Sequence, residues 1–330
     1  MKHGLIIGKF YPFHRGHQYL IDVALSGCDK LTVLVCDGAH QEISAKVRAR
    51  WITEENPSVE VRVIADTIPD DDSRAWAAYT IEVLGKAPDV VFTSEEYGEA
   101  YAHLMGCTHV LVDRVRTHIP ISGTALRADT FGGWEFLSPP AHAHFAKRVV
   151  VLGAESTGTT TLTRALAEHY NTLWVPEYGR EYSERKIGQG DTTWTTEEFF
   201  HIANEQLRRE DEAARSANKV LFCDTDAFAT MLWEERYMGE SSPATERIAH
   251  ERSHDLYILT GDEIPFVQDG YRDGEHIRHA MHKRFEEELV RTKRPFILVR
   301  GGREEREREA ICAIDRVLAL PKVPLPTRIA

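Results

Sequence analysis

The chain has 330 residues, a formal net charge of −12 and 42% hydrophobic residues, and this length favours two domains over one. The acidic excess is spread over both halves, with 15 basic against 19 acidic side chains in residues 1–150 and 25 against 33 in residues 151–330, which excludes the basic face that duplex nucleic acid requires. No apolar run approaches the roughly 20 residues that span a bilayer, and the five cysteines form no CxxC pair, so we expect a cytoplasmic protein that binds neither membranes nor nucleic acid.

The first half alternates short apolar runs with longer amphipathic segments. The runs that predict strands are Leu5–Ile7, Leu31–Cys36, Val61–Ala65, Val90–Thr93 and His109–Val112. Strands that alternate with helical patterns are typical of a parallel sheet with helices on both faces. The first half is therefore predicted to be a doubly wound α/β domain.

A second series of the same kind begins after the helical pattern stops near Leu137–Pro140. Its predicted strands are Arg148–Leu152, Val220–Cys223, Leu256–Leu259 and Phe296–Val299. We place the domain boundary near residue 145, which gives domains 1–145 and 146–330 and an α/β fold class with two doubly wound parallel sheets. The Glu- and Arg-rich segment Gly301–Arg316 is expected to be a solvated helix with little function.

The first chemical motif is His14-Arg15-Gly16-His17, which follows the strand Leu5–Ile7 and the loop Gly8–Phe13. Two imidazoles at a helix start add donors to the unpaired N–H groups there, which suits the phosphates of ATP. Near the other end of this half, Ile121–Arg127 contains two hydroxyls and a guanidinium within about one turn. Each motif alone is more often an incidental pair or a helix cap; together they could surround a triphosphate.

The second motif is Gly153–Thr161, which lies between a predicted strand and a helical pattern, as a phosphate-binding loop should. Position 159, where the GxxxxGK[ST] pattern has lysine, is Thr159. The backbone N–H groups of such a loop can still hold phosphates, but the absent ammonium weakens the prediction of phosphoryl transfer. Downstream, Asp224 and Asp226 end a strand, where a carboxylate can hold Mg²⁺ or accept a proton.

The segment Gly8–His17 together with Ile121–Arg127 resembles the HxGH nucleotidyltransferase superfamily, and nearly the whole chain is similar to the NadR-type bifunctional enzymes. The resemblance implies a Rossmann-like nicotinamide mononucleotide adenylyltransferase followed by a P-loop ribosylnicotinamide kinase. Some relatives carry a helix-turn-helix before the transferase. Because the first strand here begins by Leu5, we expect no such module and no operator binding.

The resemblance also implies a role for each candidate residue. Catalytic roles fall to His14, His17, Lys9, Arg127, Asp224 and Asp226; binding of ATP and nicotinamide mononucleotide to Gly8, Phe10, Arg48, Arg50, Ser94, Glu95, Asp113, Arg114, Arg116, Ser122 and Thr124; ATP binding in the second domain to Gly153, Glu155, Ser156, Gly158, Thr159, Thr160, Thr161, Arg272 and Arg278; riboside binding to Glu177, Tyr178 and Arg180; and Mg²⁺ to Thr160 and Asp224. Arg272 and Arg278 lie in a segment that resembles a lid, and one of them could replace the absent lysine.

The reaction implied is adenylyl transfer from ATP to nicotinamide mononucleotide, giving NAD and pyrophosphate, coupled to phosphorylation of nicotinamide riboside by ATP with Mg²⁺ as cofactor. Two alternatives stay open: transfer to another phosphate ester, and a second domain that binds nucleotide as a regulatory pseudokinase. A homo-oligomer is also left open. We do not expect His276, His279 and His282 to hold a metal, because no carboxylate or Cys partner completes a set. We expect Trp76, Trp134, Trp174 and Trp233 to be packing residues.

Overall fold

The structure is a computed structural model, and it describes residues 1–268, 270 and 274–320. The chain divides into two compact units, Met1–Ala141 and a second one that begins at His142. The boundary predicted from the sequence, near residue 145, lies a few positions later. Among the described residues, no helix is both long and apolar enough to cross a membrane.

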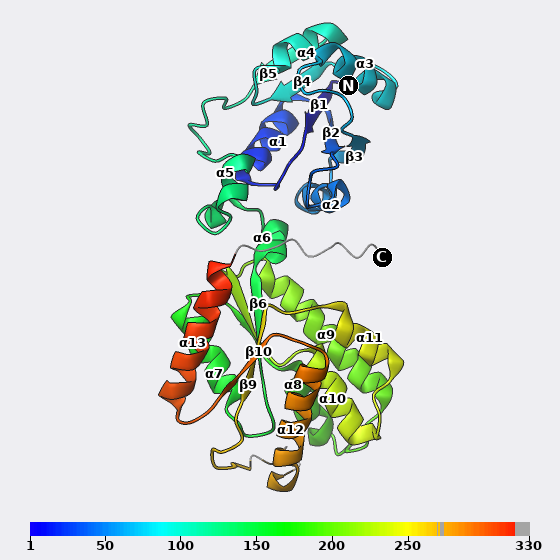
Figure 1. The fold of residues 1–330 in the computed structure, drawn as a ribbon. Helices are drawn as coiled ribbons and strands as arrows, with labels where there is room; N and C mark the ends of the chain where they lie inside the picture. The colour runs from blue at the N-terminus through cyan, green and yellow to red at the C-terminus, as the bar shows by residue number, and fades with distance from the viewer. Residues whose placement is uncertain (269, 271–273, 321–330) are drawn as a thin grey trace. The chain divides into compact units, whose positions relative to one another are not determined.

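The first unit contains a five-stranded, all-parallel sheet in the order β3-β2-β1-β4-β5 (Figure 1). Its strands are β1 (His3–Gly8), β2 (Lys30–Asp37), β3 (Glu60–Ala65), β4 (Val90–Thr93) and β5 (Thr108–Leu111). Each of them coincides with a predicted strand. From β1 the strand order runs outward to β2 and β3, and then continues on the other side of β1 with β4 and β5. A crevice is expected at the carboxyl ends of β1 and β4, where the strand order reverses.

Helices cover both faces of this sheet. They are α1 (Arg15–Gly27), α2 (Ala45–Glu55), α3 (Ser73–Leu84) and α4 (Gly98–Met105). The chain then forms α5 (Gly123–Ala128), the 3₁₀ helix η1 (Trp134–Phe136) and α6 (Pro139–Phe145), within which the first unit ends. Trp76 of α3 and Met105 of α4 pack with Leu34 of β2 in one core cluster. Right-handed crossovers place α1 and α2 on the opposite face.

The second unit contains another five-stranded, all-parallel sheet, in the order β10-β9-β6-β8-β7. Its strands are β6 (Lys147–Leu152), β7 (Trp174–Val175), β8 (Val220–Asp224), β9 (Leu256–Thr260) and β10 (Phe296–Val299). Four of these were predicted; β7 was not, because two residues carry no periodicity. The predicted α/β class with two doubly wound parallel sheets is confirmed.

The helices of this unit are α7 (Thr159–His169), α8 (Tyr178–Gly188), α9 (Thr196–Ala214), α10 (Ala227–Met238), α11 (Pro243–Glu251), α12 (Glu275–Arg291) and α13 (Arg303–Ala319). Figure 1 shows α7 and α13 on one side of the sheet and α9 to α11 on the other. Leu166 and Ile314 join Val149 and Phe222 in the core on the first side. The expectation that 301–316 is only a solvated face is wrong in part, because Arg306, Ala310 and Ile314 are buried.

Candidate active sites

The start of α1 fixes the orientation and tautomer of His14. His14 is the N-cap residue, and its Nδ1 accepts the backbone N–H of Gly16 at 3.0 Å. A neutral imidazole that accepts at Nδ1 carries its proton on Nε2. Because His14 lines the cavity described below, this ring offers an N–H donor there without a charge.

His17 lies one turn further along α1 and stacks on His14, with ring centroids 3.7 Å apart. The ring of Phe10 lies 4.9 Å from the His17 ring. Burial lowers the pKa of His14 to about 4, and the charge of Arg116 acts in the same direction. Burial likewise lowers the pKa of His17 well below its ordinary value. Both rings are therefore neutral at physiological pH, and a neutral imidazole carries one N–H donor.

This assignment predicts an unusual imidazole titration. The ring signals of His14, identified by their loss in His14→Gln, should titrate in NMR spectra with a midpoint near pH 4. Because the unfolded ring titrates near 6.5, the unfolded state binds more protons below that pH. The contribution of the neutral ring to stability is thus full above about pH 6.5 and declines as the pH falls toward 4. A midpoint near 6.5 in the folded chain would contradict it.

The turn at the start of α5 touches the loop that follows β1. Arg127 donates to the Tyr11 carbonyl at 2.6 Å and to the Thr124 hydroxyl at 3.0 Å. A side chain at Gly123 would place its Cβ 2.6 Å from the Tyr11 oxygen, so this approach requires glycine. Ser122 caps the helix by accepting the backbone N–H of Ala125. The two motifs, far apart in the sequence, thus form one wall.

Both motifs line a single cavity of about 920 Å³. The predicted residues that line it are Gly8, Lys9, Phe10, His14, His17, Ser94, Glu95, Asp113, Arg116, Ser122, Thr124 and Arg127. It is also lined by residues that sequence reasoning missed, among them Gln41, Asp66, Asp70 and Trp76. Trp76, expected only to pack, therefore does both. The cavity lies at the carboxyl edge of the sheet, as the strand order requires.

Lys9 is held by two carboxylates at this cavity. Its ammonium lies 3.0 Å from Asp70 and 3.8 Å from Asp66. Asp70 and Lys9 are both exposed enough for the pair to open at small cost. A contact of Lys9 with the β- or γ-phosphate of ATP requires the pair to open in this way.

Three predicted ligands, Arg48, Arg50 and Arg114, do not line the cavity. Arg48 is fully buried, donates to the carbonyls of Ile43 at 2.9 Å and Cys36 at 3.2 Å, and also contacts the Lys9 carbonyl. It therefore supports the loop after β1 from behind. Arg50 is exposed on α2. Arg114 is exposed and pairs with Glu96.

In the second unit, the loop between β6 and α7 has the shape of a phosphate-binding loop. A Cβ at Gly153 would lie 2.2 Å from the Thr260 hydroxyl, so only glycine fits there. Gly158 has φ +84°, a conformation that favours glycine, and α7 begins at the next residue. The backbone N–H groups at this helix start are available to an anion.

Thr160 and Asp224 meet beside this loop. The Thr160 hydroxyl donates to the Asp224 carboxylate at 2.5 Å, and Asp224 is buried at the end of β8. Burial raises the pKa of Asp224, an effect that the hydrogen bond from Thr160 opposes. A buried carboxylate without a cation beside it is costly, and a hydroxyl with a carboxylate is a ligand pair that suits Mg²⁺. The residues present therefore fit the metal.

These residues border a cavity of about 250 Å³ with an aromatic wall. The predicted residues that line it are Gly153, Glu155, Ser156, Gly158, Thr159, Thr160, Thr161, Glu177, Arg180 and Asp224. Sequence reasoning missed the aromatic wall, which consists of Trp194, Phe199, Trp233 and Tyr237, with Trp194 and Phe199 ring centroids 5.1 Å apart. Trp233, expected to pack only, faces this cavity.

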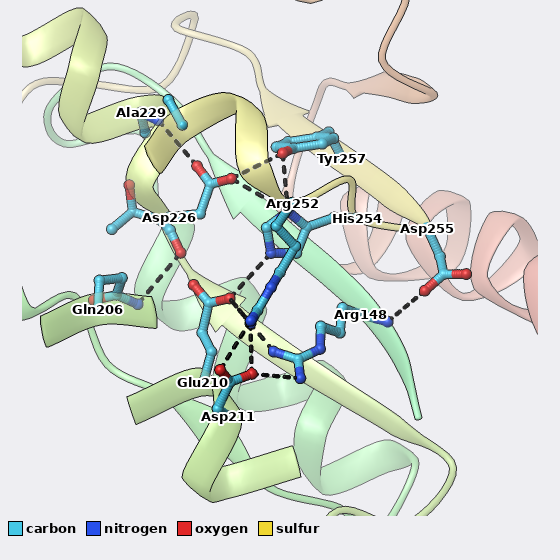
Figure 2. A network of polar contacts seen from close by, with 12 residues as sticks. Arg148, Gln206, Glu210, Asp211, Asp226, Ala229, Arg252, His254, Asp255 and Tyr257 are labelled. Carbon is cyan, nitrogen blue, oxygen red and sulfur yellow. Dashed lines mark hydrogen bonds and ion pairs between the residues drawn. The ribbon is translucent and has the colours of Figure 1, made fainter. Parts of the chain in front are cut away.

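Asp226 lies elsewhere, contrary to the catalytic role that we expected (Figure 2). It accepts the backbone N–H of Ala229 at 2.9 Å as the N-cap of α10, and the hydroxyl of Tyr257 at 2.8 Å. His254 connects this carboxylate to Glu210, which is fully buried. Asp226 is 1% exposed and does not line the cavity, so it belongs to a structural network.

Two other predicted residues, Tyr178 and Arg278, do not line this cavity. Tyr178 is buried, with its hydroxyl 3.0 Å from His201, and does not line the cavity. Arg278 is also outside the lining, and Arg272 lies outside the described residues. Among the described residues, no group of three or more His, Cys, Asp or Glu side chains could hold a metal ion.

The chain is similar to proteins of known function over most of its length. Residues 148–306 match the family model of an AAA domain, and residues 3–67 match that of the citrate lyase ligase C-terminal domain. The trifunctional NAD biosynthesis/regulator proteins NadR of Escherichia coli (strain K12) and Salmonella typhimurium are each 31% identical over 291 residues, which is 82% of this chain and 71% of theirs. The nicotinamide-nucleotide adenylyltransferase of Thermococcus kodakarensis is 24% identical over 192 residues, 54% of this chain and 100% of its own.

Two solved structures share the fold over nearly the whole chain. One is a NadR protein in complex with NR, with a TM-score of 0.76, 23% identity and 97% of each chain covered. The other is a NadR protein in complex with NAD and AMP-PNP, with a TM-score of 0.71, 21% identity and 100% of this chain and 98% of that chain covered. At these identities, the likeness establishes the fold of both units.

Proposed function

The chain belongs to the NadR family, and from this premise we propose that its first unit joins nicotinamide mononucleotide to the adenylyl group of ATP while its second unit phosphorylates nicotinamide riboside. It is an enzyme of NAD biosynthesis. The observation that carries the first assignment is the convergence of His14, His17 and the Ser122–Arg127 turn on one cavity.

In the first unit, an oxygen of the mononucleotide 5′-phosphate attacks the α-phosphorus of ATP. The bond from the α-phosphorus to the bridging oxygen breaks, and pyrophosphate leaves. The neutral rings of His14 and His17 donate to phosphoryl oxygens, and the cationic Arg127 and Arg116 balance the charge that builds up there. No protein nucleophile is needed.

In the second unit, the 5′-hydroxyl of the riboside attacks the γ-phosphorus of ATP and ADP leaves. The loop 153–158 would hold the phosphates, and Thr160 with Asp224 would hold Mg²⁺, which neutralises phosphate charge when it is bound. Asp224 is engaged by Thr160, so we assign the acceptance of the hydroxyl proton to Glu177, which lines the same cavity. The aromatic wall suits the flat pyridinium ring of the riboside.

Chromatography of the products formed from nicotinamide riboside and excess ATP tests both steps. NAD should accumulate, with nicotinamide mononucleotide as the intermediate. NAD formed only from the added mononucleotide would refute riboside phosphorylation and support the regulatory role of the second unit. If phosphopantetheine or glycerol phosphate is turned over faster than the mononucleotide, the first assignment fails.

Restoring the lysine of the loop should increase riboside phosphorylation. Thr159→Lys places an ammonium beside the phosphates, and we expect kcat/KM for ATP to rise by about tenfold, as one charge-assisted contact supplies. His169→Lys, which adds a positive charge at the exposed far end of α7, is the matched control and should leave the rate near that of the parent. Equal rates for Thr159→Lys and the parent would show that the ammonium contributes nothing in this site.

A further inference from the structure

Three carbonyl groups of the loop 153–158 accept hydrogen bonds from side chains outside the cavity lining. The Thr157 hydroxyl donates to the Ala154 carbonyl at 2.7 Å. Arg278 donates to the Ser156 carbonyl at 3.1 Å, and Arg306 donates to the Thr157 carbonyl at 2.7 Å. None of these three donors lines the cavity.

Arg306 is 5% exposed and uses its whole guanidinium fork. Besides Thr157, it donates to the carbonyls of Gly261 and Gly301, each at 3.0 Å, and it pairs with Glu263 at 2.7 Å. It therefore ties the loop to the end of β9 and to the segment that precedes α13. Arg278, in the first turn of α12, is equally buried, and its Nε has no hydrogen-bond partner among the described residues.

These contacts orient the peptide groups of the loop. In a trans peptide the C=O and the following N–H point in opposite directions. Fixing the Ser156 and Thr157 carbonyls away from the cavity therefore turns the N–H groups of Thr157 and Gly158 to the other side. A guanidinium behind each carbonyl also polarises the peptide group, which strengthens its N–H as a donor to an anion.

We propose that Arg278 and Arg306 are positioning residues that preorganise this loop and supply from behind it part of the positive charge that Thr159 lacks. The inference rests on the proposed binding of nucleotide phosphates by the loop. It differs from our expectation that a lid arginine would take the place of the lysine within the cavity, because Arg278 is engaged with the loop backbone. The ligand class is the phosphate chain of a nucleoside di- or triphosphate.

Backbone hydrogen exchange of residues 153–161, measured by mass spectrometry on the full chain over a range of ADP concentrations with Mg²⁺, tests this role. In Arg306→Met we expect half-maximal protection of the loop to require at least about tenfold more ADP than in the parent. Arg306→Lys keeps the charge but loses the fork and should fall between the two. Arg303→Met, on the exposed face of the same helix, should behave as the parent.

If the backbone amides of β6 and β8 also lose their protection in Arg306→Met, the second unit has unfolded in that variant. Arg278→Met then replaces it in the test, and we again expect protection of the loop to require more ADP than in the parent. A folded methionine variant whose half-protecting ADP concentration stays within about twofold of the parent would overturn the inference, as would a parent loop that millimolar ADP does not protect. A third outcome separates the two proposals. If ADP protects the loop of the parent, the arginine variants require more ADP, and the parent phosphorylates no riboside, then the kinase assignment is refuted and this inference is supported.

Discussion

His17→Ala should nearly abolish NAD formation from nicotinamide mononucleotide and ATP. We expect the turnover rate at saturating substrates to fall by about two to three orders of magnitude, the range that removal of one transition-state donor gives. His17 lines the cavity and stacks on His14, so the alanine removes a donor and also loosens its neighbour. Chromatographic assay of NAD measures the effect. His17→Gln, which keeps an N–H donor, should recover part of the rate.

The matched control for this variant is His103→Ala. His103 is exposed on α4 and does not line the cavity, so its removal should leave NAD formation unchanged. Riboside phosphorylation by the His17→Ala chain provides a second check, since none of the described residues of the first unit lines the second cavity. A turnover rate within about fivefold of the parent, in a folded variant, would contradict the assignment of the imidazoles to the phosphates.

Asp224→Asn is expected to reduce riboside phosphorylation by at least about 10²-fold while NAD formation from added mononucleotide continues at the parent rate. The carboxylate is the charged partner of Thr160 at the loop, and asparagine removes that charge from the proposed Mg²⁺ site. The rate of nicotinamide mononucleotide formation from the riboside in a single turnover measures this loss of phosphorylation. Raising the Mg²⁺ concentration should restore part of the lost rate.

Asp226→Asn is the matched control, two residues further on. Asp226 accepts two hydrogen bonds in a buried network, so the change should reduce the free energy of unfolding of the second unit by about 1–3 kcal/mol. The rate per folded molecule should stay close to that of the parent. If Asp226→Asn loses phosphorylation as fully as Asp224→Asn in a folded chain, the separation of the two carboxylates is wrong.

Much of the architecture could be predicted because the strands are apolar runs bounded by polar segments. His14, His17 and Ser122 could be found because each stands at a strand-to-helix junction, where the chain itself determines which groups point to the crevice. The burial of Arg48 and Arg306 could not be predicted, since nothing in the local sequence pattern distinguishes a buried arginine from an exposed one. Their burial depends on carbonyl groups that other segments bring to them.

The same limit explains the different places of Asp224 and Asp226. Asp224 is the last residue of β8, and Asp226 stands two positions later. The alternation of side chains along a strand predicts that the two carboxylates point to the same side, but Thr225 has φ +70° and breaks this alternation. The aromatic wall was missed for a related reason: Trp194 and Phe199, at the start of α9, meet Tyr237 of α10 only because the two helices pack together.

Among the residues that the structure describes, each cavity is lined by side chains of one unit. We therefore expect the two chemistries to be separable by mutation: a change at Thr159 should alter riboside phosphorylation and leave adenylyl transfer as it is. Mutations can consequently weaken or abolish riboside phosphorylation in such an enzyme while the formation of the dinucleotide continues. Complementation of strains that lack one step or the other would measure the two activities separately.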